Sequence, residues 1–164
     1  MGQEEFAALL ENAGVQTLVD VRSVPGSRRN PQFGRQEMEA WVPATGMTYV
    51  WSRELGGFRR TTPQSRNVGL RHASFRGYAD YMGTRSFVEA RERLLETAAR
   101  SQTAIMCSET LWFRCHRRLI ADSLSLTCLG LVLHLDHRGK LIPHEATDAA
   151  RLDDGEVSYP GEMR

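Results

Sequence analysis

The residues best suited to chemistry lie in a stretch of twelve that begins at Cys107 and reads CSETLWFRCHRR. It holds two cysteines, a glutamate, a histidine and three arginines. A cysteine thiolate is a nucleophile, and nearby histidine and arginine side chains favour the thiolate over the thiol. The first interpretation is therefore that Cys107 or Cys115 attacks a substrate. Glu109 or His116 would then transfer protons, and Arg117 would bind an anionic group.

Two other interpretations of this stretch stay open. In one, the ligands of a zinc ion are Cys107, Cys115 and His116, and a later histidine, His134 or His144, supplies the fourth. The spacing C-x7-C-H is not a usual zinc pattern, however, and neighbouring residues of a helix point about 100° apart. In the other, the cysteines are small core residues and the arginines form surface ion pairs. The density of polar groups favours the nucleophile, so we predict no metal site.

A second polar group follows the apolar run TLVDV. Asp20 and Arg22 are separated by one residue, so on a strand both side chains point to the same face. Asp20 is a candidate general base and Arg22 a candidate anion-binding residue; the alternative is an ion pair at the sheet edge. Ser27 and Arg28 extend this group into a loop rich in proline, glycine and arginine, and we assign both to anion binding.

Positive charge is concentrated in one part of the chain. Between Arg22 and Arg76 there are ten arginines and three glutamates, a local charge of +7 in a chain whose net charge is +1. Arginine presents a planar fork that pairs with phosphate or carboxylate through two hydrogen bonds. Tyr78 and Tyr81 follow directly, and aromatic rings interleaved with arginines can stack on bases. These features predict an anionic partner, either a small ligand or a nucleic acid.

Length and composition indicate an ordinary globular protein. The chain has 164 residues, of which 41% are hydrophobic and 25% charged, which excludes collagen-like and low-complexity classes. No apolar run approaches the ~18 residues that span a bilayer, and no secretory signal is present, so we expect no membrane partner. Three cysteines without an export signal indicate a cytoplasmic, reducing setting. Cys128 lies among leucines and is expected in the core.

Strands alternate with helices along the chain, which predicts a single three-layer α/β domain with a mostly parallel sheet flanked by helices. Apolar runs predict strands at residues 17–21, 47–51, 103–107 and 130–135. Apolar spacing predicts helices at residues 4–12, 36–41, 78–82, 86–100 and 112–125. Residues 53–74 are irregular, and loops of this length are usually functional or mobile. The domain is expected to end at residue 147, and the polar segment 148–164 to be poorly ordered.

The two polar groups follow the first and third predicted strands. Ligands of an open α/β sheet bind outside the carboxyl ends of its strands, so we expect Asp20 and Cys107 to face one cleft. The sequence Leu55-Gly56-Gly57 is interpreted only as a turn signal. No Walker loop, Rossmann fingerprint, zinc-protease motif or serine elbow is present, so we predict no cofactor.

A set of motifs spans the chain in a fixed order. They are Leu18-Val-Asp20-Val-Arg22 with Pro25 and Ser27, then Tyr49, Leu55-Gly56-Gly57, Phe75-x-x-Tyr78-x-x-Tyr81-Met82, Cys107-x-Glu109 and Cys115-His116-Arg117. From the first helix to about Thr147 this order resembles domain-of-unknown-function family 488. The resemblance implies a small bacterial or archaeal cytoplasmic α/β protein without an assigned activity. It places the family's characteristic polar residues at Asp20, Arg22, Ser27, Cys107, Glu109, Cys115, His116 and Arg117.

Members of that family usually open with a short strand and a Gly-His-Ser-type loop, whereas this sequence begins at the first helix. Without that strand, one edge of the sheet is expected to be unpaired. The preferred function is an enzyme that acts on a nucleotide, nucleic-acid or other phosphorylated substrate. The alternatives are a non-catalytic nucleic-acid-binding module that uses residues 22–76, and a structural metal domain. The sequence indicates neither the reaction nor the oligomeric state.

Overall fold

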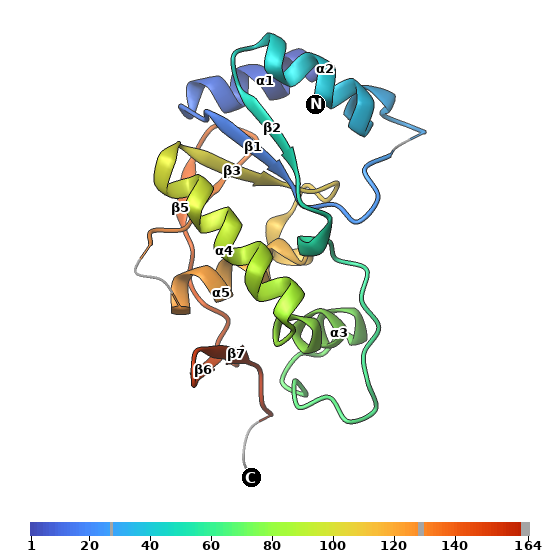
Figure 1. Ribbon diagram of the computed structural model, residues 1–164, viewed down its shortest axis with the longest axis vertical. Helices are drawn as coiled ribbons and strands as arrows, with labels where there is room; N and C mark the ends of the chain where they lie inside the picture. Colours follow the sequence, from blue (N-terminus) through green and yellow to red (C-terminus); the bar gives the residue numbers. More distant parts are fainter. Residues whose placement is uncertain (27, 128–129, 162–164) are drawn as a thin grey trace.

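The computed structural model describes residues 1–26, 28–127 and 130–161 (Figure 1). The helices of this part are α1 (Gln3–Asn12), α2 (Arg35–Ala44), α3 (Ala73–Met82), α4 (Arg85–Arg100) and α5 (Arg117–Thr127). Its strands are β1 (Thr17–Asp20), β2 (Thr48–Trp51), β3 (Thr103–Met106), β4 (Leu133–Leu135), β5 (Leu141–Pro143), β6 (Arg151–Asp153) and β7 (Glu156–Ser158). Short 3-10 turns lie at η1 (Pro31–Phe33), η2 (Arg53–Leu55) and η3 (Trp112–Arg114). This mixture confirms the predicted α/β class. None of the helices in the described residues is long and apolar enough to cross a bilayer.

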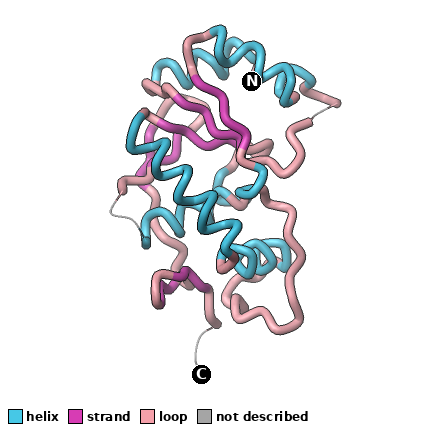
Figure 2. The backbone as a smooth tube through the Cα atoms, in the orientation of Figure 1, coloured by secondary structure: helices cyan, strands magenta, loops and turns pink. Residues whose placement is uncertain are grey.

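The central sheet has three parallel strands in the order β2-β1-β3. Figure 2 shows the three strands side by side with helices on both faces. All four residues of β1 are buried. A central parallel strand is covered on both faces, which explains why its successive residues Leu18 and Val19 are both apolar rather than alternating with polar ones.

The two faces of the sheet have separate apolar cores. Successive side chains of a strand point to opposite faces. Leu18 belongs to a buried cluster with residues of α1 and α2, such as Leu10 and Met38. Val19 belongs to a second cluster with residues of α4 and α5, such as Leu94 and Leu119. This alternation decides on which side of the sheet each functional side chain lies.

The fourth predicted strand does not join the central parallel sheet. The strand β4 pairs antiparallel with β5 in a separate two-stranded sheet, with Leu133 opposite Pro143. Between them, Asp136 Oδ1 accepts the backbone N–H groups of Arg138 and Lys140, at 2.8 Å each. Gly139 adopts a φ of +83°, which favours glycine. An apolar run predicts a strand but not its partner, and the hairpin turn is the missed signal.

The segment after residue 147 also differs from the expectation of a poorly ordered tail. The strands β6 and β7 form an antiparallel hairpin. Tyr159 is fully buried, and its backbone N–H donates to Asn67 Oδ1 at 2.8 Å. Val157 is 4% exposed and lies in the same apolar cluster as Leu119 of α5. Two apolar anchors within a polar composition therefore hold this segment on the core.

Candidate active site

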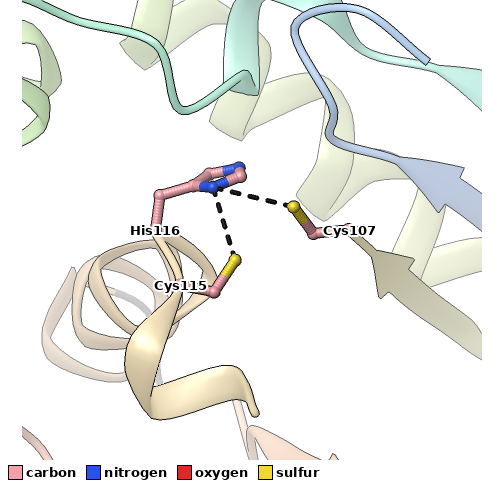
Figure 3. Close-up of side chains that lie close together, drawn as sticks. All are labelled: Cys107, Cys115 and His116. Carbon is pink, nitrogen blue, oxygen red and sulfur yellow. Dashed lines mark hydrogen bonds between the residues drawn. The ribbon is translucent and has the colours of Figure 1, made fainter. Parts of the chain in front are cut away.

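Three side chains from two segments meet beside the sheet (Figure 3). The ligand atoms of Cys107, Cys115 and His116 all lie within 4.8 Å of one another, and we call this group the Cys–His cluster. His116 Nδ1 lies 3.4 Å from Cys115 Sγ and 4.0 Å from Cys107 Sγ. Cys115 and His116 are buried, whereas Cys107 is half-buried. The cluster therefore has one thiol that a reactant can reach.

The convergence of Cys115 and His116 depends on a break in the predicted helix. Residues 112–125 do not form one helix, because Cys115 is extended, with φ −126° and ψ 156°, and α5 begins only at Arg117. The 100° separation expected for neighbours on a helix therefore does not apply. The broken helix also separates the arginines, since Arg118 donates to Thr147 Oγ1 at 2.8 Å while Arg117 donates to the Glu109 carbonyl.

The proton of His116 is placed by the neighbouring strand. Its Nε2 lies 2.9 Å from the carbonyl oxygen of Val21, the residue after β1. A carbonyl oxygen only accepts hydrogen bonds, so Nε2 carries a hydrogen. In the neutral ring, Nδ1 then has a free lone pair that points toward both sulfurs. This nitrogen can act as a base or as a metal ligand.

Gly56 and Gly57 allow the chain to pass close to the cluster. A Cβ atom at Gly57 would lie 2.5 Å from Nδ1 of His116, and one at Gly56 would lie 2.4 Å from Oγ of Ser23. Both contacts are shorter than real Cβ atoms make, so each position requires glycine. The sequence Leu55-Gly56-Gly57 is thus more than a turn signal. The sequence signal for this close approach was the pair of consecutive glycines after Leu55, a residue that is buried.

The two thiols have opposite acidities. A hydrogen bond from Cys115, together with His116 and the backbone N–H of Glu109, lowers the pKa of Cys107 well below its ordinary value, although burial opposes the shift. The same bond and burial raise the pKa of Cys115. The pair therefore favours one thiolate, at the half-buried Cys107, and one thiol that stabilises it.

Asp20 and Arg22 form a buried ion pair. The Arg22 guanidinium donates to Asp20 from Nη2 at 2.5 Å and from Nε at 2.8 Å, and the Tyr49 hydroxyl donates at 2.6 Å. Asp20 is fully buried and Arg22 is 5% exposed. Burial alone would lower the pKa of Arg22, but the hydrogen bonds and charge of Asp20 raise it. The ion pair considered as the alternative for the two residues is therefore formed, at the end of the central strand rather than at an edge of the sheet.

The expected common cleft is not formed, because the sheet lies between the two groups. Asp20 is paired in register with Met106, so Asp20 and Cys107 point to opposite faces. Arg22 Nη2 contacts Sδ of Met38 in α2, while Cys107 packs against the cluster that contains α4 and α5. The strand ends do meet, but β1 contributes the backbone carbonyl of Val21 rather than a carboxylate.

The remaining candidate residues lie at the margin of the cluster or away from it. The Glu109 side chain is exposed, and its backbone contacts Cys107 and Arg117. Arg117 is half-buried, and its Nε is buried without a hydrogen-bond partner in the described structure. Arg28 is exposed on the loop after β1. Ser27 and Cys128 lie outside the described residues.

A polar network on α5 was missed by sequence reasoning. Asp122 is fully buried and accepts hydrogen bonds from His144 Nε2 at 3.0 Å and from the Tyr159 hydroxyl at 2.8 Å. Its carboxylate also accepts the backbone N–H and the hydroxyl of Thr147, at 2.8 and 2.7 Å. One aspartate on an amphipathic helix gives no sequence signal of such a role. Asp122 joins the C-terminal segment to α5.

The two histidines considered as a fourth zinc ligand belong to this network. His134 Nε2 lies 2.8 Å from His144 Nδ1, and the Trp112 ring stacks on His134 with centroids 3.5 Å apart. Burial, followed by the charges of His144 and Arg117, lowers the pKa of His134 to about 4. His134 and His144 therefore form a pair held by Asp122 rather than part of the Cys–His cluster.

Comparison with protein-family models gives a match over residues 2–124, to the family described as domain of unknown function DUF488. The match covers most of the chain and contains the whole Cys–His cluster and the Asp20–Arg22 pair. The chain belongs to this family. The DUF488 match ends before His134 and His144, so the histidine pair lies beyond it. No curated protein and no solved structure matches this DUF488 chain.

Proposed function

We propose that the protein is a thiol-dependent enzyme whose nucleophile is Cys107 and whose substrate carries an anionic group, such as a phosphate. The observation that supports this proposal is the fixed tautomer of His116, whose Nδ1 lone pair faces both sulfurs while Nε2 donates to the Val21 carbonyl. A nucleophile, a base and a third group that orients the base are the parts of an activated nucleophile.

The chemical step follows from these contacts. The proton of the Cys107 thiol resides on His116 Nδ1, so the reacting pair is a thiolate and an imidazolium. The thiolate attacks an electrophilic atom of the substrate, and the bond to the leaving group breaks as the bond to sulfur forms. The imidazolium then returns the proton to the leaving group. The 4.0 Å separation of Cys107 Sγ and Nδ1 is typical of a catalytic hydrogen bond that shortens when substrate binds.

Two guanidinium groups near the cluster support an anionic substrate. The charge of Arg117 acts to lower the pKa of Cys115, and the charge of Arg59 acts to lower the pKa of Tyr78. The ring centre of Tyr78 lies 5.1 Å from that of His116. The Nε atoms of both arginines are buried and have no hydrogen-bond partner among the described residues. Neither guanidinium is in an ion pair among the described residues, since Arg59 lies over the Tyr81 ring and Arg117 donates to the Glu109 carbonyl, and positive charge without an acidic partner favours a bound anion.

Asp20 and Arg22 contribute to this function by positioning. Their ion pair, with the bond from the Arg22 backbone N–H to Asp20 Oδ1 at 3.0 Å, fixes the chain on either side of Val21. Trp51 Nε1 donates to the Arg22 carbonyl at 2.9 Å. The Val21 carbonyl is therefore held where it orients His116.

The test is the alkylation rate of each cysteine at neutral pH, measured by peptide mass mapping with iodoacetamide. We expect Cys107 to react at least about tenfold faster than an unstructured peptide cysteine, because its thiolate is stabilised. Replacement His116→Ala should remove most of this advantage, and Cys128→Ser is the control for loss of one thiol. A Cys107 that reacts no faster than the peptide would refute the thiol enzyme.

A second function, nucleic-acid binding, is favoured by one observation. Five arginines of the basic stretch are exposed and have no acidic partner in the described part of the chain: Arg28, Arg29, Arg53, Arg60 and Arg71. Binding through phosphates weakens steeply between about 50 and 200 mM salt. Fluorescence anisotropy with a labelled single-stranded oligonucleotide measures this, and affinity that is unchanged by salt argues against the binding module.

A further inference from the structure

We propose that Cys107 Sγ, Cys115 Sγ and His116 Nδ1 also form a binding site for one zinc-class ion, and that the bound ion and the reactive thiolate exclude each other. The site itself follows from geometry and donor chemistry. Only its consequence, the control of thiol reactivity, rests on the proposed function.

The spacing of the three atoms suits a tetrahedral ion. With Zn–S of about 2.3 Å and Zn–N of about 2.0 Å, ligand atoms of a tetrahedral site lie about 3.5 to 3.8 Å apart. The two measured separations, 3.4 and 4.0 Å, lie on either side of this range, and all three atoms fall within 4.8 Å. Shifts of a few tenths of an ångström would therefore complete the site. Thiolate and imidazole donors select zinc or copper(I) over magnesium and calcium.

The groups around the three atoms are those that surround bound metals. A metal-ligating histidine nearly always donates its other ring N–H to a carbonyl or carboxylate, and His116 Nε2 donates to the Val21 carbonyl. The backbone N–H groups of Glu109 and Arg117 donate to the sulfurs of Cys107 and Cys115. These bonds hold the donors in place and reduce the charge on the thiolates.

The described residues supply three ligands to the site and no fourth. Among the described residues, the group of possible ligands consists of these three and no other, and His134 and His144 are bonded to each other. Gly57 passes close to Nδ1, because a Cβ there would lie 2.5 Å from that nitrogen, so a larger residue would displace the His116 ring. Three protein ligands with one open position are typical of reactive rather than structural zinc sites. A water molecule or a small anion would occupy the fourth position.

A bound ion would prevent the Cys107 thiolate from attacking a substrate. The ion takes up the lone pair of Cys107 that attacks the substrate and the lone pair of His116 Nδ1 that accepts the proton. Both halves of the proposed nucleophile are lost together, and removal of the ion restores them. The cluster would therefore exist in a metal-bound form and a reactive metal-free form.

The metal site is tested by titrating the full chain, after treatment with a chelator, with Co²⁺ and then with Zn²⁺. We expect one ion per chain, with sulfur-to-cobalt charge-transfer bands, the visible bands of tetrahedral Co²⁺, and displacement of Co²⁺ by Zn²⁺. Cys107→Ser, Cys115→Ser and His116→Gln should each weaken binding by more than the roughly 10- to 100-fold that outer-shell changes cost. Cys128→Ser and His137→Gln, an exposed histidine, are the matched controls. Circular dichroism shows whether each variant is folded.

Alkylation of Cys107 with and without one equivalent of Zn²⁺ separates the two proposals. We expect Zn²⁺ to block alkylation and the chelator to restore it. Rapid alkylation with no Co²⁺ bands would overturn the metal site and leave the thiol enzyme standing. Tight binding of one ion to a chain whose metal-free Cys107 reacts slowly would overturn the thiol enzyme and support the metal site. Binding that survives Cys107→Ser in folded protein would overturn the assignment of the ligands.

Discussion

At the residue scale, the chemistry of the cluster is set by backbone groups as much as by side chains. The Val21 carbonyl fixes the proton on His116, and the N–H of Glu109 donates to the Cys107 sulfur. Neither contribution can be seen in residue types. The composition of the stretch from Cys107 to Arg117 therefore identified the candidate reactive atoms, while their protonation states depend on which main-chain groups lie beside them.

Gly57 provides a test at the same scale. We predict that Gly57→Ala lowers the Cys107 alkylation rate at least about tenfold and costs about 1–3 kcal/mol in unfolding free energy, because the new Cβ meets the His116 ring at 2.5 Å. Alkylation mapping and urea unfolding measure the two effects. Gly26→Ala is the control, since a Cβ there meets nothing within 4 Å. Wild-type reactivity in Gly57→Ala would show that the ring tolerates displacement.

His134 predicts a pH dependence of stability. Its folded-state pKa, about 4, lies below the ordinary value of 6.5. Between these two pH values, His134 binds a proton in the unfolded chain but not in the folded protein. The free energy of unfolding should therefore fall as the pH drops from about 6.5 to about 4. The groups that face His134 are His144, Trp112, Arg117 and, through its charge, Asp122.

Urea unfolding at a series of pH values checks this dependence. His134→Phe keeps a ring to stack on Trp112 and should flatten the curve between pH 6.5 and 4, whereas His137→Gln at an exposed position should not. A slope that is the same in all three proteins would assign the pH dependence to other groups.

At the scale of elements, the sequence predicted where strands lie along the chain better than it predicted which strands pair or which face each side chain occupies. The continuous apolar run of β1 was predicted to within one residue, because burial on both faces leaves a clear pattern. The apolar run of β4 looks the same but belongs to a hairpin. The broken helix before α5 could not be predicted, since the residues around Cys115 are compatible with a helix and His116 contacts Val21 and Cys107, which are distant in sequence.

The register of the sheet determines whether Asp20 and Cys107 can line one cleft. A shift of one residue between β1 and β3 would place Asp20 and Cys107 on the same face. The observed pairing of Asp20 with Met106 places them on opposite faces. Sequence patterns locate both strands and do not show their relative register, so the two polar groups could be found but not assigned to one site.

The buried ion pair of Asp20 and Arg22 gives a prediction for β1. Asp20→Asn leaves the Arg22 guanidinium buried without a counter-charge, so we expect a loss of about 3–5 kcal/mol in unfolding free energy. Glu39→Gln, in the exposed pair with Arg35, should cost less than about 1 kcal/mol. Urea unfolding of both variants provides the comparison. Equal losses would mean that burial does not distinguish the two pairs.

At the scale of the whole molecule, the C-terminal segment is part of the core. Tyr159→Ala removes a fully buried ring and a hydrogen bond to Asp122, so we predict a loss of about 3–5 kcal/mol. Leu152→Ala, at a side chain in the neighbouring strand that is 46% exposed, should cost far less. Thermal or urea unfolding distinguishes the two. A small loss for Tyr159→Ala would restore the expectation of a loosely held tail.

The helix α5 connects this segment to the Cys–His cluster. His116 directly precedes α5, and Asp122 within it is bonded to Tyr159, thirty-seven residues later. During synthesis the thiols leave the ribosome well before Tyr159 does, and until then α5 lacks its final support. A nascent chain would thus contain Cys107 and Cys115 before the Tyr159–Asp122 hydrogen bond anchors α5, the helix that follows them.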